Sequence, residues 1–173
     1  MSQDSHPVWA VYDKLRTASL NVKYYSRRLV NLERQNFCIE LFLMATAPSS
    51  AIAGLWFWQT ETGKETWLVL GVVTAVLAVV KPLLGLTKRI RDLEGVLSDY
   101  RMLEYDLREL KSLIEQRQKY DAALQADFKR VGQRERSLVE RTPESREVMR
   151  VKVLCEAEIL KEYPIERFFV PAD

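Results

Sequence analysis

The fold is decided by two apolar stretches, FCIELFLMATAPSSAIAGLWFW at residues 37–58 and WLVLGVVTAVLAVVKPLLGL at residues 67–86. As helices, both are long enough to cross a bilayer core, which needs about 20 apolar residues. Each stretch holds a single charged residue, Glu40 in the first and Lys81 in the second. We therefore predict two transmembrane helices. The alternative is a pair of central helices in a soluble helical bundle.

Basic side chains gather at the ends of the stretches that face away from the connecting loop. They are Lys23, Arg27, Arg28 and Arg34 before the first stretch, and Lys88, Arg89, Arg91 and Arg101 after the second. The loop, residues 59–66, holds Lys64 as its only base and is flanked by Trp58 and Trp67. Short basic flanks stay in the cytoplasm, and tryptophan prefers the membrane interface. The sequence thus predicts a hairpin with an outer loop and both termini in the cytoplasm.

Amphipathic helices are predicted on both sides of this hairpin. Apolar residues recur at spacings of three and four through residues 8–36, with no breaker before the first span, so this helix should run on into the membrane. A long helix is expected over residues 87–140 and a final one over residues 142–163, beginning at Thr142-Pro143. The apolar tail 164–173 should dock on these cytoplasmic helices. The predicted fold class is an all-α membrane protein of one domain, a two-helix transmembrane hairpin with long amphipathic cytoplasmic helices.

The sequence offers no catalytic chemistry. There is no glycine-rich phosphate loop, no metal-ligand spacing of Cys or His, and no nucleophile with a base. We therefore predict no catalytic, cofactor-binding or metal-binding residues, and no enzyme. Cys38 and Cys155 are expected to be free thiols, because disulfides do not persist in the cytoplasm. His6 is interpreted as a surface residue, and the net charge of +2 is too small to indicate direct nucleic acid binding.

The spans carry two features of interest. The first is a stripe of small residues in each span, which lets helices approach closely. Its members are Ala47, Ala51 and Gly54 in the first span, then Gly71, Ala75, Ala78, Pro82 and Gly85 in the second, where Thr74 is the one polar side chain deep in the span. The stripes serve packing within the hairpin or between protomers around a pore. The second feature is the pair of intramembrane charges, Glu40 and Lys81. Both lie near the cytoplasmic surface, where they either pair with each other or extend separately to water.

The architecture resembles the SLATT family of two-transmembrane effector domains. The resemblance is carried by the aromatic and small residues of the first helix, the minimal loop between two spans, and the long charged helix that follows; the residues of that first helix are Trp9, Tyr12, Leu15, Ala18, Tyr24 and Tyr25. It implies a multi-pass protein of the bacterial inner membrane that forms a homo-oligomeric pore. The pore would depolarise the cell and arrest its growth when a partner sensor or nucleotide-signal synthase triggers it in antiviral defence. The alternative is a non-conducting anchor or adaptor that recruits a partner through its coiled coil.

Overall fold

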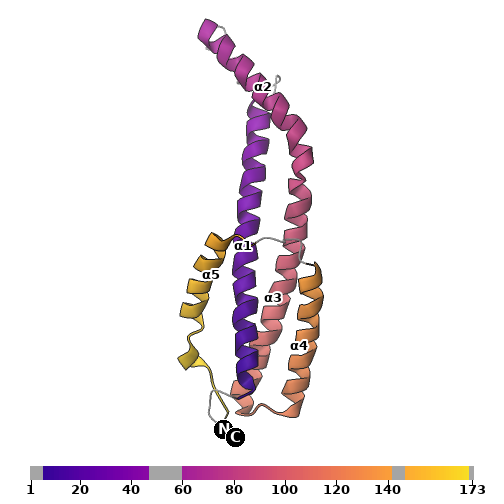
Figure 1. The fold of residues 1–173 in the computed structure, drawn as a ribbon, viewed down its shortest axis with the longest axis vertical. Helices are drawn as coiled ribbons and strands as arrows, with labels where there is room; N and C mark the ends of the chain where they lie inside the picture. Colours follow the sequence, from indigo (N-terminus) through magenta and orange to yellow (C-terminus); the bar gives the residue numbers. More distant parts are fainter. Residues whose placement is uncertain (1–5, 47–59, 142–146, 172–173) are drawn as a thin grey trace. The chain divides into compact units, whose positions relative to one another are not determined.

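The computed structural model describes residues 6–46, 60–141 and 147–171, and all regular elements in these ranges are helices. They are α1 (Val8–Ala45), α2 (Glu61–Leu84), α3 (Leu86–Arg117), α4 (Ala122–Arg141), α5 (Met149–Glu162) and the short 3-10 helix η4 (Ile165–Arg167) (Figure 1). The chain, predicted as one domain, separates into two compact units. We call Met1–Arg28 with Asp92–Asp173 the bundle unit, and Leu29–Arg91 the apolar unit.

α1 begins at a histidine cap. The Val8 backbone N–H donates to His6 Nδ1 at 3.1 Å, which satisfies one of the donors that a helix start leaves free. The predicted apolar stripe of this helix is buried at its start, where Val8, Tyr12 and Leu15 are fully covered. The helix continues without interruption through Ala45, so the predicted continuity into the first span is confirmed that far. The rest of the predicted first span, residues 47–58, lies outside the described residues.

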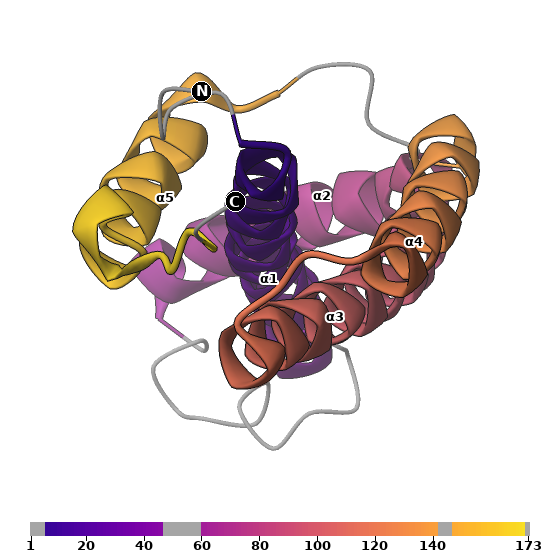
Figure 2. The ribbon, with the colours of Figure 1, turned by 90° about the horizontal axis from the view of Figure 1, so that it is seen from below.

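In the bundle unit, the first part of α1 lies between α3 and α5, and α4 lies beside α3 (Figure 2). The core consists of leucine, isoleucine and aromatic side chains. Leu107 and Ile114 of α3 are fully buried, and the Tyr25 and Tyr100 rings stack with their centroids 5.4 Å apart. Removal of this apolar surface from water is the main term that holds the helices together.

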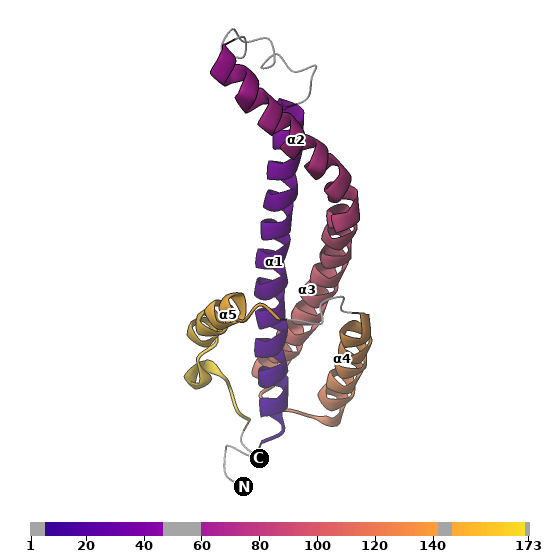
Figure 3. The same cartoon turned by 45° about the horizontal axis from the view of Figure 1, so that its top comes forward.

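The prediction of one helix over residues 87–140 is wrong. The chain turns after Arg117, where Gln118 adopts a left-handed conformation with φ 53°, and α4 runs back beside α3 (Figure 3). Asp121 caps the new helix, because its Oδ1 accepts the Leu124 N–H at 3.0 Å. The reversal buries Leu124, Val131 and Leu138, which a continuous helix would leave in solvent.

Two further boundaries differ from expectation. Residues 59–66 were predicted as a loop, yet α2 begins at Glu61, because Thr60 Oγ1 caps it by accepting the Gly63 N–H at 3.1 Å. α2 ends before Gly85, whose φ of 57° suits glycine at a helix end. The final helix begins at Met149 and not at residue 142; Thr142 and Pro143 lie outside the described residues.

The apolar tail docks on the bundle unit, as predicted. The Phe168 ring stacks on Tyr12 with a centroid distance of 4.3 Å, and the Tyr12 hydroxyl donates to the Phe169 carbonyl at 2.6 Å. Burial, with a smaller contribution from the Glu115 carboxylate, raises the pKa of Tyr12 to about 12. The hydroxyl thus remains a donor over the whole physiological range.

The turn at Gln118 gives a test of the α3–α4 reversal. A non-glycine residue in the left-handed conformation destabilises the folded chain by roughly 1–2 kcal/mol. Glycine removes this strain, but it loses more conformational entropy on folding, which offsets part of the stabilisation. We expect Gln118→Gly to leave the stability unchanged or raise it by up to about 1 kcal/mol. Gln133→Gly, the same change at an exposed position inside α4, should lower it by about 0.5–1 kcal/mol. Thermal unfolding in detergent, followed by circular dichroism, measures both. Equal losses in the two variants would contradict the turn.

Candidate functional site

The apolar unit contains a line of polar contacts between α1 and α2. The hydroxyl oxygens of Thr46 and Thr74 lie 2.7 Å apart, and each hydroxyl also lies within hydrogen-bond distance of a backbone carbonyl one turn earlier, Phe42 O at 2.8 Å and Leu70 O at 2.7 Å. A hydroxyl bonded in this way adds no unsatisfied group to an apolar environment. Thr74 therefore faces α1.

Glu40 and Lys81, the one charged residue of each apolar stretch, lie together further along the same line. Lys81 Nζ donates to Glu40 Oε1 at 2.9 Å, and Asn36 Nδ2 donates to the same oxygen at 3.0 Å. Of the two alternatives considered for Glu40 and Lys81, the structure thus has the pair. The oxygen of this amide, Asn36 Oδ1, is buried without a hydrogen-bond partner among the described residues.

These contacts define the relative direction of the two helices. From Thr46 to Glu40 the numbering on α1 falls, while from Thr74 to Lys81 the numbering on α2 rises. The helices are therefore antiparallel where they touch. We call Asn36, Glu40, Thr46, Thr74 and Lys81 the α1–α2 seam.

From Trp67 on, the surface of α2 outside the seam is apolar and largely exposed. Within the described residues one helix, beginning at Glu61, is long and apolar enough to cross a membrane, and none of its most apolar segment is buried in the chain. Leu68, Val69 and Val79 each expose at least 60% of their surface. The small residues Gly71, Ala75 and Ala78 are exposed too, and no described atom lies within 4 Å of a Cβ built at Gly71.

The stripe of small residues therefore does not form the described contact between α1 and α2. Thr74 forms that contact and lies on a neighbouring face of the helix. Ala47, Ala51 and Gly54, the predicted stripe of the first span, lie outside the described residues.

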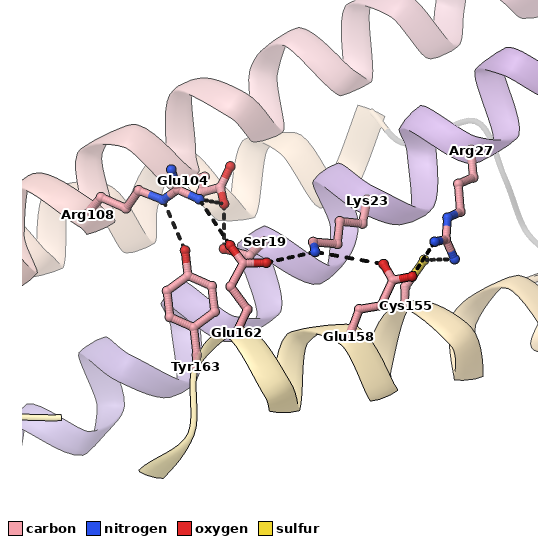
Figure 4. Close-up of polar contacts among 9 residues, drawn as sticks. All are labelled: Ser19, Lys23, Arg27, Glu104, Arg108, Cys155, Glu158, Glu162 and Tyr163. Carbon is pink, nitrogen blue, oxygen red and sulfur yellow. Dashed lines mark hydrogen bonds and ion pairs between the residues drawn. The ribbon is translucent and has the colours of Figure 1, made fainter. Parts of the chain in front are cut away.

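The bundle unit contains an ionic clasp that holds α5 to α1 (Figure 4). We define it by Lys23 and Arg27 of α1 and Glu158 and Glu162 of α5. Lys23 Nζ lies 2.7 Å from Glu162 Oε2, and Arg27 Nη2 lies 2.5 Å from Glu158 Oε1. In the sequence, the two basic residues of the clasp are four residues apart, and so are its two acidic residues, so each pair lies on one face of a helix. The sequence does not indicate that these two helices pack against each other.

The residues around the clasp connect it to α3. Arg108 Nε donates to the Tyr163 hydroxyl at 3.1 Å, and Arg108 also pairs with Glu104, which accepts a hydrogen bond from Ser19 at 2.6 Å. Arg16 of α1 donates twice to the Tyr163 carbonyl, at 2.8 and 3.1 Å. Three helices thus share one polar network at the end of α5.

In the clasp, hydrogen bonds between oppositely charged side chains favour the ionised forms of Lys23 and Glu158. The Glu162 hydrogen bond raises the pKa of Lys23, and the Arg27 hydrogen bond lowers the pKa of Glu158. Burial raises the pKa of the Cys155 thiol, which keeps it protonated and a weak nucleophile. Both cysteines are free thiols, as predicted, with Cys155 buried and Cys38 exposed.

The described residues hold no group of His, Cys, Asp and Glu side chains placed to bind a metal ion. No protein-family model, curated protein or solved structure matches this chain. Its function is therefore inferred from its own residues, in particular the uncovered helix α2, the seam and the clasp.

The seam gives a prediction for its ion pair. Glu40→Gln and Lys81→Met should each destabilise the detergent-solubilised protein, since each strands one charge in an apolar surrounding. The double variant should lose less than the sum of the two, because it removes both charges together. Thermal unfolding of the four proteins in this cycle measures the coupling. Additive losses would contradict the pair and favour separate contacts of each charge with water.

The clasp gives a prediction for pH dependence. Because the pKa of Glu158 is lowered in the folded protein, its contribution to stability is present above the unfolded pKa of about 4.3 and disappears as the pH falls through the folded value. Glu158→Gln should therefore lower the melting temperature slightly at pH 7, and this difference should shrink towards pH 3. Glu156→Gln, at an exposed carboxylate on the same helix, is the control. A difference that stays constant with pH would contradict the clasp.

Proposed function

We propose that this protein is a homo-oligomeric, pore-forming membrane effector of a bacterial antiviral system. In this proposal residues 37–58 and 67–86 cross the inner membrane as a hairpin, and both termini lie in the cytoplasm. When a partner sensor or nucleotide signal triggers the protein, the assembled hairpins conduct ions, depolarise the membrane and arrest growth. The observation that carries the proposal is the uncovered, membrane-length helix α2 with open space at Gly71.

The geometry supports this proposal in two ways. The seam partners the polar side chains of α2 with those of α1, so the pair can enter lipid with its hydroxyls bonded and its charges paired. Two spans are too few to enclose a channel, so conduction needs several copies. The exposed Gly71, Ala75 and Ala78 give a neighbouring helix a surface for close approach.

The second candidate is a non-conducting membrane anchor or adaptor that recruits a partner through the bundle unit. The adaptor candidate is favoured by the outward face of α2, the face that points away from α1. Val69, Val72 and Val76 are exposed on this face, whereas Thr74, the polar residue among them in the sequence, faces α1. Such a face suits lipid and offers no group that replaces the hydration of an ion. The two candidates differ in whether ions leak.

The topology on which both candidates depend can be tested by labelling. In a background of Cys38→Ser and Cys155→Ala, we expect Thr62→Cys to react with an impermeant thiol reagent in intact cells. Ser5→Cys should react only after the cells are permeabilised, because the basic flanks keep the termini inside. Labelling of Ser5→Cys but not Thr62→Cys in intact cells would reverse the orientation.

The pore proposal predicts a specific effect at the small-residue stripe. Gly71→Leu should leave the protein folded and inserted, because no described atom occupies the space, but it should block close approach of another hairpin. We expect strongly expressed wild-type protein to depolarise bacterial cells, and Gly71→Leu to abolish this. Val72→Leu, at the adjacent exposed apolar position, is the matched control and should depolarise like the wild type. A voltage-sensitive dye reports the result, with the membrane fraction blotted in parallel. An unchanged potential with inserted wild-type protein would leave the adaptor as the better account.

A further inference from the structure

The α1–α2 seam places the polar side chains of the apolar part of α2, Thr74 and Lys81, against polar side chains of the facing segment. Thr46 and Thr74 meet at 2.7 Å, and Glu40 and Lys81 meet at 2.9 Å. The outward faces near these contacts are apolar, with Val72, Val76 and Val79 of α2 and Met44 of α1 each more than half exposed. Beyond Thr66 on α2, the hydroxyl and charged side chains, Thr74 and Lys81, are thus already paired with α1 or with Thr46 directly after it.

A conducting path needs polar groups along its wall. Ionisable and hydroxyl side chains inside a membrane either pair or face water, while purely apolar constrictions expel water and block ions. The outward face of α2 would therefore line a dry path. A wet path requires the seam hydroxyls.

The small-residue stripe and the seam lie on neighbouring faces of α2. At about 100° per residue, the stripe at Gly71, Ala75 and Ala78 is centred roughly a quarter turn from the line through Thr74 and Lys81. A second hairpin that packs on the stripe thus sits next to the seam. Contacts made in assembly can replace those that the seam gives up.

We propose that the seam is the closed ion path of this protein, an inference that rests on the proposed pore function. In the resting chain Thr46 bonds Thr74 and Glu40 pairs with Lys81, which keeps α1 and α2 together. In the assembled state α1 and α2 part along the seam, and Thr46 and Thr74 face the water-filled path. The conducted species are small hydrated ions, which hydroxyl oxygens can solvate.

A disulfide across the seam tests this. The variant carries Thr46→Cys and Thr74→Cys in the background of Cys38→Ser and Cys155→Ala, as the full chain expressed strongly in bacterial cells. Oxidation should join the two thiols within one chain, seen as loss of labelling by a maleimide-linked polymer on a gel. We expect the cross-linked protein to lose its ion leak, and a membrane-permeant reductant to restore it. The two single-cysteine variants, treated identically, should leak throughout.

The outcomes of the cross-linking experiment distinguish failure of the seam proposal from failure of the pore proposal. A leak that persists in fully cross-linked protein overturns the seam proposal and leaves the pore proposal standing. Failure of the thiols to join shows that Thr46 and Thr74 do not meet, and also overturns the seam proposal. If the parent protein itself gives no leak, the pore proposal fails, and the seam proposal with it.

A second measurement does not depend on the cross-link. Thr74→Cys alone should react with a small, charged, impermeant thiol reagent in leaking cells, and should stay unreactive when Gly71→Leu blocks assembly. Val72→Cys, on the outward face, should stay unreactive in both cases. Reaction of Val72→Cys without reaction of Thr74→Cys would place the wall of the path on the other face and overturn the proposal.

Discussion

The structure depends on one constraint, which is that the apolar surface of α2 is left uncovered by the described residues of this chain. Exposed valine and leucine cost on the order of 25 cal/mol for each square ångström left in water. The described chain buries none of the most apolar segment of this helix. A helix bonds its own backbone groups and can therefore enter hydrocarbon intact. In the proposed function, lipid and neighbouring copies cover the surface that the described residues leave open.

The same constraint appears in α1, where the burial of apolar residues inverts along one helix. At its start, Val11 and Leu15 are fully buried in the bundle unit. Near its end, Phe37, Leu41 and Met44 each expose more than half of their surface. The first pattern is that of a helix packed into a core, and the second leaves apolar side chains uncovered by the described residues. One uninterrupted helix thus contains a buried part and an exposed apolar part.

Hydrophobic periodicity predicted most of this architecture from the sequence, including α1 and the docked tail. It missed the α3–α4 reversal because Leu124 and Val131 keep a helical spacing whether the helix continues or folds back. The turn also lacks glycine and proline, since Gln118 takes the left-handed position. Asp121, as a cap for Leu124, was the available signal. In the seam, the pairing of Thr46 with Thr74 depends on how the helices are rotated, which spacing along one chain does not determine.

The polar contacts of the seam fix the register of α1 against α2, which apolar contacts alone do not determine. Valine and leucine side chains pack nearly as well after one helix slides past the other by a turn, because one apolar contact replaces another. A slide of that size would separate Lys81 from Glu40 and Thr74 from Thr46 at once, so that both contacts between the helices are lost together. Two contacts of different chemistry therefore select one arrangement of α1 and α2. This gives a reason for two mostly apolar helices to retain charged and hydroxyl side chains that cost energy to bury.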